Sequence, residues 1–295
     1  MINMKKYAGG KKPYELFSEA VDRKDKNSAD TIALNVNKRK VEIAYRYYER
    51  AMDNQKLGLL TPSTVLSSIK QPLLGMYSSG CKLVKDFRTW HFNNNPQTYN
   101  NVCPYCTINS ANTTEHILPK EVYSEYAVNV FNLIPACSEC NSFKGEDIFD
   151  ENGEIFTINF YTDTLPDIRY LFARITHIVG GVQFEYYLDN RNGIDRNLYA
   201  LIQRHFKRYH LINRYYTKAV QELSNIENYF KFEEITCEAD YDKAASKLIR
   251  KTDADAVAYG RNHWKIVMYY DAATSPVFKS YITVSYTHMT LPTIA

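Results

Sequence analysis

The spacing of hydrophobic and polar positions predicts a helical N-terminal region from Pro13 to about Trp90. Between residues 41 and 51, apolar and aromatic side chains recur every three or four residues, which is the period of one helix face. These side chains are Val41, Ala44, Tyr45, Tyr48 and Ala51. A further helix is expected to begin at Thr61-Pro62-Ser63, because proline suits the first turn of a helix.

A polar, asparagine-rich loop at residues 93–101 marks a boundary, and the pattern changes again after Gly145. The segments Ile155 to Asp163 and Gln183 to Leu188 predict short strands, joined through Gly180-Gly181. Helices are expected again from Arg196 to about Tyr229. The side chains expected on one face of that helical stretch are Leu198, Ile202, His205, Tyr209, Ile212 and Tyr216. The pattern therefore predicts an α+β chain with mostly helical flanks.

The last twelve residues, 284–295, need separate treatment. Their sequence resembles the translated read-through of a sequencing adapter, so we interpret them as a non-native tail and exclude them from the fold. The alternative is a native edge strand, because residues 281–286 alternate in the manner of a strand.

The charge of the chain is close to neutral, with 36 basic and 33 acidic side chains. A nucleic-acid partner would therefore have to be held by a local basic face. There is no run of about 18 apolar residues, and residues 1–12 are polar and lysine-rich, without the apolar core of a secretory signal. We therefore expect a cytoplasmic protein that does not enter the membrane.

The most specific pattern is a pair of Cys-x-x-Cys motifs, formed by Cys103, Cys106, Cys137 and Cys140. Two such turns can direct four thiolates at one zinc ion, and a sphere of four cysteines leaves no position for water, so the zinc would be structural. The alternatives are two disulfides or a redox-active motif. A reducing compartment argues against disulfides, and redox motifs do not usually occur as a matched pair.

The residues between and just after the cysteine pairs suit phosphodiester hydrolysis. This reaction needs an activated water, a base, and a cation against the charge that develops on the phosphate. His116 would be the base. Glu115 offers a hard oxygen ligand to Mg²⁺ or Mn²⁺, and Asn141 offers a carbonyl oxygen to the same ion. Asn132 would hold the loop and orient the imidazole.

These motifs resemble the HNH endonucleases of the zinc-containing ββα-metal type. The matching segments are Cys103-Pro104-Tyr105-Cys106, Glu115-His116-Ile117-Leu118-Pro119-Lys120, Asn132-Leu133-Ile134-Pro135-Ala136-Cys137 and Cys140-Asn141-Ser142-Phe143-Lys144-Gly145. The resemblance implies His116 as general base and Asn132 as the residue that positions it. It implies Glu115 and Asn141 as ligands of the catalytic metal, and the four cysteines as zinc ligands. The acid and the histidine would lie on a β-hairpin, and a helix beginning near Ser138, capped by its hydroxyl, would carry Asn141.

The expected layout has four parts. Residues 1–92 form the helical N-terminal region, and residues 93–150 form the small ββα-metal (HNH) core with its two zinc knuckles. Residues 151–283 form short strands and then helices that contact nucleic acid, and residues 284–295 are the read-through tail. The core departs from the common family pattern by Glu115 in place of aspartate and Asn141 in place of histidine. Asn159-Phe160-Tyr161 resembles a His-Pro-Tyr stretch of larger relatives, with Asn159 in place of the histidine.

Several basic residues are weaker candidates for phosphate contacts. Lys120 and Lys144 each adjoin the core motif, although lysines beside a turn are usually solvated. A basic stretch farther on would follow a nucleic-acid backbone or form a solvated helix face, and it consists of Arg204, Lys207, Arg208 and Arg214.

The leading hypothesis is a metal-dependent HNH endonuclease that hydrolyses phosphodiester bonds of double-stranded DNA. A role in restriction or antiphage defence, with a partner ATPase or another defence protein, is suggested by the family alone. The alternatives are a non-catalytic, zinc-stabilised module that binds nucleic acid, and a nuclease directed at RNA.

Overall fold

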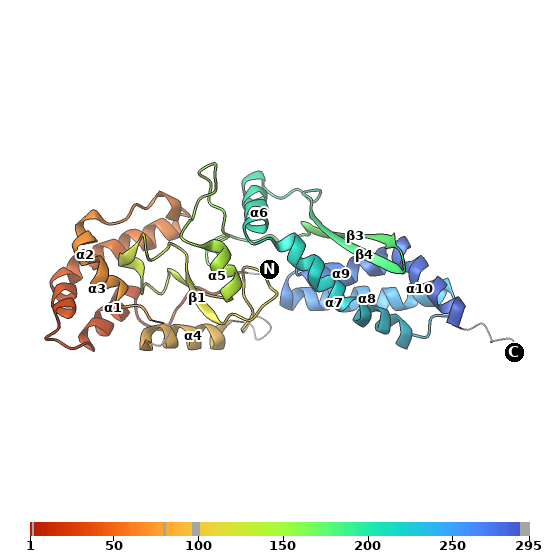
Figure 1. Ribbon diagram of the computed structural model, residues 1–295, viewed down its shortest axis with the longest axis horizontal. Helices are drawn as coiled ribbons and strands as arrows, with labels where there is room; N and C mark the ends of the chain where they lie inside the picture. The colour runs from red at the N-terminus through yellow and green to blue at the C-terminus, as the bar shows by residue number, and fades with distance from the viewer. Residues whose placement is uncertain (2, 79–80, 96–100, 290–295) are drawn as a thin grey trace. The chain divides into compact units, whose positions relative to one another are not determined.

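A computed structural model describes residues 1, 3–95 without 79–80, and 101–289. The chain divides into two compact units (Figure 1). The N-terminal unit comprises Ile2–Leu165, and the C-terminal unit comprises Pro166–Ala295 together with Met1. The predicted helical region and the predicted core thus lie in one unit, which also takes in the first part of the region that the sequence assigned to residues 151–283. Within the described residues no helix is both long and apolar enough to cross a membrane.

The first part of the N-terminal unit is helical, as predicted. Its helices and 3-10 turns are α1 Pro13–Asp22, α2 Ala29–Asp53, η1 Leu57–Leu59, η2 Thr64–Ile69, α3 Lys70–Leu74 and α4 Lys82–Asn94. Ser28 caps α2 by accepting a hydrogen bond from the Thr31 amide at 3.2 Å. The helix expected at Thr61-Pro62-Ser63 begins with η2 and becomes α-helical only at Lys70. The predicted loop at 93–101 begins within α4, and residues 96–100 of it lie outside the described residues.

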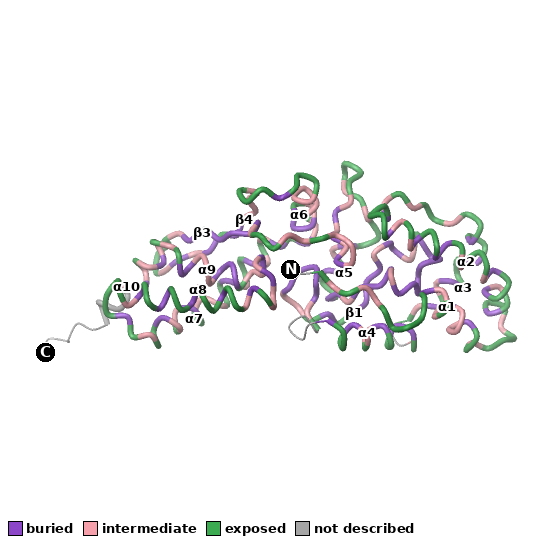
Figure 2. The backbone as a smooth tube through the Cα atoms, turned by 180° about the vertical axis from the view of Figure 1, so that it is seen from behind, coloured by how far each residue is buried: buried purple, intermediate pink, exposed green. Residues whose placement is uncertain are grey.

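The second part of this unit is a small hairpin followed by a short helix. Strands β1 (Thr113–His116) and β2 (Leu133–Ala136) pair antiparallel, with His116 opposite Leu133. The turn η4 (Ser124–Tyr126) lies in the connection between them, and α5 (Ser138–Lys144) follows β2 directly and contacts β1. Figure 2 shows that buried backbone gathers around β1 and along the inner sides of α2 and α3. The predicted mixed α+β class, with small two-stranded sheets, is confirmed.

A hydrophobic core joins the helices to the hairpin. Residues from α1, α2, α3 and α4 share this core with the long connection between β1 and β2. The connection contributes Leu118, Tyr123, Tyr126, Val128 and Val130. The helices therefore hold the connection that lies beside the candidate catalytic residues, in addition to covering the sheet.

The C-terminal unit contains a second hairpin covered on one face by helices. Strands β3 (Leu171–Ile178) and β4 (Gly181–Leu188) pair antiparallel, and Gly180 adopts a φ of 82° in the turn between them. Alternate side chains are buried in the first part of β4, whereas β3 buries Leu171, Phe172, Ala173 and Ile175, and the helices α7, α9 and α10 contact the hairpin. The helices are α6 Arg196–Arg208, α7 Leu211–Phe232, α8 Glu238–Tyr259, α9 Trp264–Thr274 and α10 Pro276–Met289.

Three predictions from the sequence pattern are corrected here. The segment Ile155 to Asp163 is not a strand. Its polar side chains bind their own backbone instead: the Asn159 side chain accepts from the Tyr161 amide, and the Asp163 carboxylate accepts from the Asn159 amide. The partner of β4 is therefore β3, which the prediction did not include.

The predicted helical stretch from Arg196 to about Tyr229 is interrupted. It ends as α6 at Arg208 and resumes as α7 at Leu211, because His210 has a φ of 51°, in the left-handed region. At the end of the chain, helix α10 occupies residues 276–289, which contradicts the alternative of an edge strand at 281–286. Residues 290–295 of the predicted read-through tail lie outside the described residues.

Candidate metal and catalytic site

Four cysteine thiols meet in the N-terminal unit. The Sγ atoms of Cys103, Cys106, Cys137 and Cys140 lie within 4.8 Å of one another, and all four residues are buried. The Sγ atoms of Cys106 and Cys137 are 3.9 Å apart. Sulfurs bound to one tetrahedral zinc at about 2.3 Å would lie about 3.8 Å apart, so this donor set fits structural zinc. The predicted four-cysteine cluster is supported, and none of its members forms a disulfide.

The backbone around the cysteines supplies hydrogen bonds to sulfur. In the first turn, the Ile108 amide donates to Cys106 Sγ at 3.5 Å, and Thr107 takes a left-handed φ of 56°. In the second, the Cys140 amide donates to Cys137 Sγ at 3.4 Å. Amide donors stabilise thiolates, which are the form that binds zinc. Cys137 thereby caps α5, so the prediction that the Ser138 hydroxyl is the cap is wrong.

Two contacts connect α5 to β1 and place the candidate metal ligands. Asn141 Nδ2 donates to Thr113 Oγ1 at 3.5 Å, and one helical turn later Lys144 Nζ lies 3.2 Å from Glu115 Oε1. The Thr113 hydroxyl donates to the Ala136 carbonyl, so it can only accept from Asn141. The amide nitrogen of Asn141 therefore faces Thr113, and its carbonyl oxygen is directed elsewhere.

Glu115 and Lys144 form a buried ion pair. Glu115 is 6% exposed and Lys144 is 1% exposed. Burial raises the pKa of Glu115, and the Lys144 ammonium acts in the opposite direction. Lys144 is thus not the solvated lysine that its position beside a turn suggests.

His116 is held by its Nε2 atom. This nitrogen lies 2.9 Å from the Ala127 carbonyl oxygen. A carbonyl oxygen only accepts, so Nε2 carries the proton of the neutral ring and Nδ1 keeps its lone pair. Burial lowers the pKa of His116 to about 4, below the near-neutral value expected for a general base. The Tyr77 ring packs edge-on against the imidazole, with 4.5 Å between ring centroids.

Asn132 fixes the connection between the strands. Its Oδ1 accepts from the Leu118 amide at 2.7 Å and from the Tyr48 hydroxyl at 3.0 Å. Its Nδ2 donates to the carbonyls of Leu118 at 2.9 Å and Tyr126 at 3.3 Å. Tyr126 precedes Ala127, whose carbonyl holds His116. Through its described contacts, Asn132 therefore positions the imidazole indirectly, by holding the loop backbone that carries the Ala127 carbonyl.

The other candidates occupy varied positions. Lys120 is half-buried, pairs with Glu121, and lies 5.9 Å above the Tyr77 ring. Asn159 lies at the turn that replaces the expected strand. The four residues of the predicted basic stretch belong to the C-terminal unit, on α6 and α7, and only Lys207 is exposed; they are Arg204, Lys207, Arg208 and Arg214.

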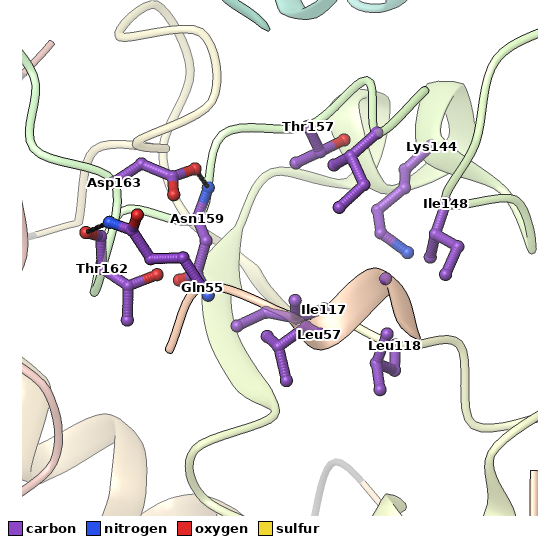
Figure 3. Close-up of a pocket in the computed structure, with 12 residues that line it drawn as sticks. Gln55, Leu57, Ile117, Leu118, Lys144, Ile148, Thr157, Asn159, Thr162 and Asp163 are labelled. Carbon is purple, nitrogen blue, oxygen red and sulfur yellow. Dashed lines mark hydrogen bonds between the residues drawn. The ribbon is translucent and has the colours of Figure 1, made fainter. Parts of the chain in front are cut away.

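A cavity of about 60 Å³ adjoins Lys144 in the N-terminal unit (Figure 3). Ile117 and Leu118, just after β1, line it together with the end of α5 and the segment 148–163. In Figure 3 the Lys144 ammonium lies near Ile148, with Asp163 and other polar groups at the opposite side of the cavity.

The residues that support the candidate site from a distance were not predicted from the sequence. Tyr48 lies on α2 and Tyr77 follows α3, yet both contact the hairpin or its connection. Tyr48 stood out only as one member of a buried helix face. The pairing of Lys144 with Glu115 was not predicted either. Asn141 and Lys144 are three residues apart, so they lie on the same side of α5.

Comparisons with known proteins agree with the motif. Residues 103–147 match the family model described as HNH endonuclease, the family that the sequence resembles. The chain is also 26% identical over 188 residues to Protein ea31 of Escherichia phage lambda, in an alignment that covers 60% of this chain and 62% of that protein. The chain therefore spans less than two thirds of that relative. No solved structure matches the chain.

Proposed function

From an HNH endonuclease domain at residues 103–147, we propose that this chain is a divalent-metal-dependent endonuclease that hydrolyses phosphodiester bonds of DNA. One observation carries the proposal: the Ala127 carbonyl fixes the tautomer of His116, the residue that follows Glu115 in β1. The neutral Nδ1 of such a ring can take a proton from water as the water attacks phosphorus.

The chain's own groups define the rest of the proposed mechanism. The pKa of His116 lies well below 7, so the imidazole is neutral and able to accept a proton at neutral pH. The loop held by Asn132 prevents the ring from turning its protonated nitrogen toward the water. Tyr77 restricts the ring from a second side. These residues orient the base, and the four-cysteine cluster fixes α5 relative to the hairpin.

The proposed catalytic ion would be held by Glu115 and Asn141. A carboxylate and an amide carbonyl are oxygen donors of the kind that Mg²⁺ and Mn²⁺ prefer. Glu115 on β1 and Asn141 on α5 both lie where this helix contacts the strand, so the chemistry of the residues fits such an ion. When bound, the ion would supply positive charge against the charge that develops on the phosphate. Lys120 remains a proposed phosphate contact.

The test compares nicking of supercoiled plasmid by the wild type and His116→Ala, with Mg²⁺ or Mn²⁺. Loss of the base should reduce the rate at least about 100-fold. His177→Ala is the matched control, because His177 is an exposed histidine of β3 in the other unit, and it should cut at the wild-type rate. Equal nicking by His116→Ala would refute the proposal.

The same assay separates the alternatives. Cleavage of RNA with intact plasmid would assign the chemistry to an RNA-directed nuclease. Binding to DNA without cleavage under every divalent ion would favour a non-catalytic zinc module. A role in restriction or antiphage defence, with a partner ATPase, is supported by family resemblance only, and an adjacent ATPase or methyltransferase gene would strengthen it.

A further inference from the structure

Lys144 pairs with the very carboxylate that the proposed function assigns to the catalytic ion. The Nζ–Oε1 distance to Glu115 is 3.2 Å, and the side chains are 1% and 8% exposed. Water therefore screens this attraction little, and removing either charge would leave the other less stabilised.

An ammonium and a divalent cation cannot both bind Glu115 closely without strong repulsion. Two positive charges separated by a few ångströms in a buried site repel more than they would in water. Asn141, which would be the second ligand of the ion under the proposed function, lies one turn before Lys144 on the same helix. Binding of the ion therefore requires the ammonium to move or the carboxylate to be shared.

The cavity beside Lys144 gives the ammonium a second place. Lys144 itself lines this cavity of about 60 Å³, which exceeds the space that one water-sized group needs, about 10–15 Å³. Ile148 and Leu118 line it on the side of the ammonium, and Asn159 and Asp163 place polar groups at its opposite side (Figure 3). The lysine stem is flexible, and Lys144 already lines the cavity, so its head has space to turn away from Glu115.

We propose that Lys144 is an internal counter-ion that holds Glu115 in the protein before the metal binds and competes with the divalent cation for this carboxylate. When the cation takes Glu115, the ammonium moves into the neighbouring cavity. Lys144 is thus a positioning residue that sets the affinity of the site for metal. The inference rests on the proposed function, because it takes Glu115 as the ligand of the ion.

The test measures Mn²⁺ affinity of the zinc-loaded full chain by electron paramagnetic resonance of free Mn²⁺. Lys144→Met removes the charge and keeps most of the length, and it should lower the Kd for Mn²⁺ about tenfold, a usual size for coupling between two ligands. Lys144→Arg keeps the charge and should stay near the wild type, while Glu115→Gln should weaken binding. A merely structural role of Lys144 would not tighten metal binding.

The control removes an exposed lysine from an ion pair of the same unit. Lys82 pairs with Asp86 on α4, and both side chains are more than half exposed, so Lys82→Met should leave the Kd unchanged. A Kd of Lys144→Met equal to or above that of Lys82→Met would overturn the inference. Lys144→Gln serves the same comparison if Lys144→Met does not fold.

A measurement on the wild type avoids variants of altered stability. In protein labelled with ¹³C at lysine Cε, the Lys144 signal, assigned with Lys144→Arg, should shift as Mg²⁺ saturates the site. A signal that does not move would overturn the inference even if DNA is cut. Failure of the proposed function looks different: the wild type would then bind no divalent ion or would cut no DNA. Absence of ion binding overturns both.

Discussion

The four-cysteine cluster and the Glu115–His116 pair occupy the same small hairpin and helix, yet they are built in different ways. Each pair of thiols in the cluster is carried by its own short turn, and the backbone amides that donate to Cys106 and Cys137 lie within three residues of the sulfur. The acid and the histidine instead depend on distant groups: Lys144 holds the one, and the Ala127 carbonyl holds the other.

Under the proposed function, this difference separates a rigid support, the four-cysteine cluster or zinc frame, from a site whose groups have to change their partners. A closed cluster of soft ligands gains from rigidity, because its ion stays in place. A catalytic carboxylate must exchange a protein partner for an ion, and a base must gain and lose a proton. Contacts from other elements can hold such groups and still release them, so the two regions should respond very differently to substitution.

The largest effect is expected from breaking the frame. Cys137→Ser removes a zinc ligand and the sulfur that caps α5. Structural zinc contributes about 10–16 kcal/mol of binding free energy in small zinc domains, so losing one thiolate should unfold the segment around the hairpin. Zinc content and amide hydrogen exchange measure this result. Cys81→Ser changes a cysteine outside the cluster and should keep the zinc. Full zinc occupancy in Cys137→Ser would contradict the assignment.

The contrast also explains what the sequence could predict. The cysteine spacing predicted the cluster, because a Cys-x-x-Cys turn determines its own geometry. The ion pair of Lys144 with Glu115 depends on how α5 docks against β1, and no local pattern encodes that contact. The hydroxyl of Tyr48 reaches Asn132 across 84 positions of the chain. The segment from Ile155 to Asp163 had an acceptable strand pattern. Its backbone amides instead donate to the side chains of Asn159 and Asp163, which keeps the segment out of a sheet.

The second-largest effect is expected from a substitution in the loop that supports His116. Asn132 donates and accepts at once, so Asn132→Asp would place a carboxylate against two carbonyl oxygens in a fully buried position. An uncompensated buried charge of this kind destabilises by about 3–5 kcal/mol. Urea unfolding measures the loss, and nicking should fall with it because the Ala127 carbonyl would move.

The matched control is Asn112→Asp. The Asn112 oxygen accepts from the Ser138 amide at 2.9 Å at the exposed start of α5, where a negative charge is favourable. Its free energy of unfolding should change by less than about 1 kcal/mol. Similar losses for both variants would show that the loop does not depend on the two-sided bonding of Asn132.

A smaller effect concerns how the helices support β2. His91 on α4 accepts from Asn95 Nδ2 and donates to the Tyr161 hydroxyl, which donates to the Leu133 carbonyl where β2 begins. Burial lowers the pKa of His91 from 6.5 to about 4. The unfolded chain therefore binds more protons in this window, and stability falls as the pH drops from about 6.5 toward 4.

Between pH 7 and pH 5 this histidine should account for about 2 kcal/mol of lost stability. His91→Gln should flatten the plot of unfolding free energy against pH by that amount, although it lowers stability at pH 7. His177→Gln, at an exposed position of the other unit, should leave the slope unchanged. Parallel plots for wild type and His91→Gln would show that β2 is supported in another way.

The smallest effect distinguishes a tyrosine that supports the loop from one that only fills the core. Tyr45 and Tyr48 lie on α2 and are fully buried, but the Tyr48 hydroxyl donates to Asn132 Oδ1, whereas the Tyr45 hydroxyl has no hydrogen-bond partner among the described residues. Tyr48→Phe removes one of the donors to Asn132 Oδ1. It should lower the free energy of unfolding by about 1 kcal/mol and slow the nicking of plasmid. Tyr45→Phe removes an unsatisfied buried hydroxyl, so its unfolding free energy should stay the same or rise. If the two variants behave alike in urea unfolding, long-range hydrogen bonding does not distinguish the proposed catalytic residues from the zinc frame.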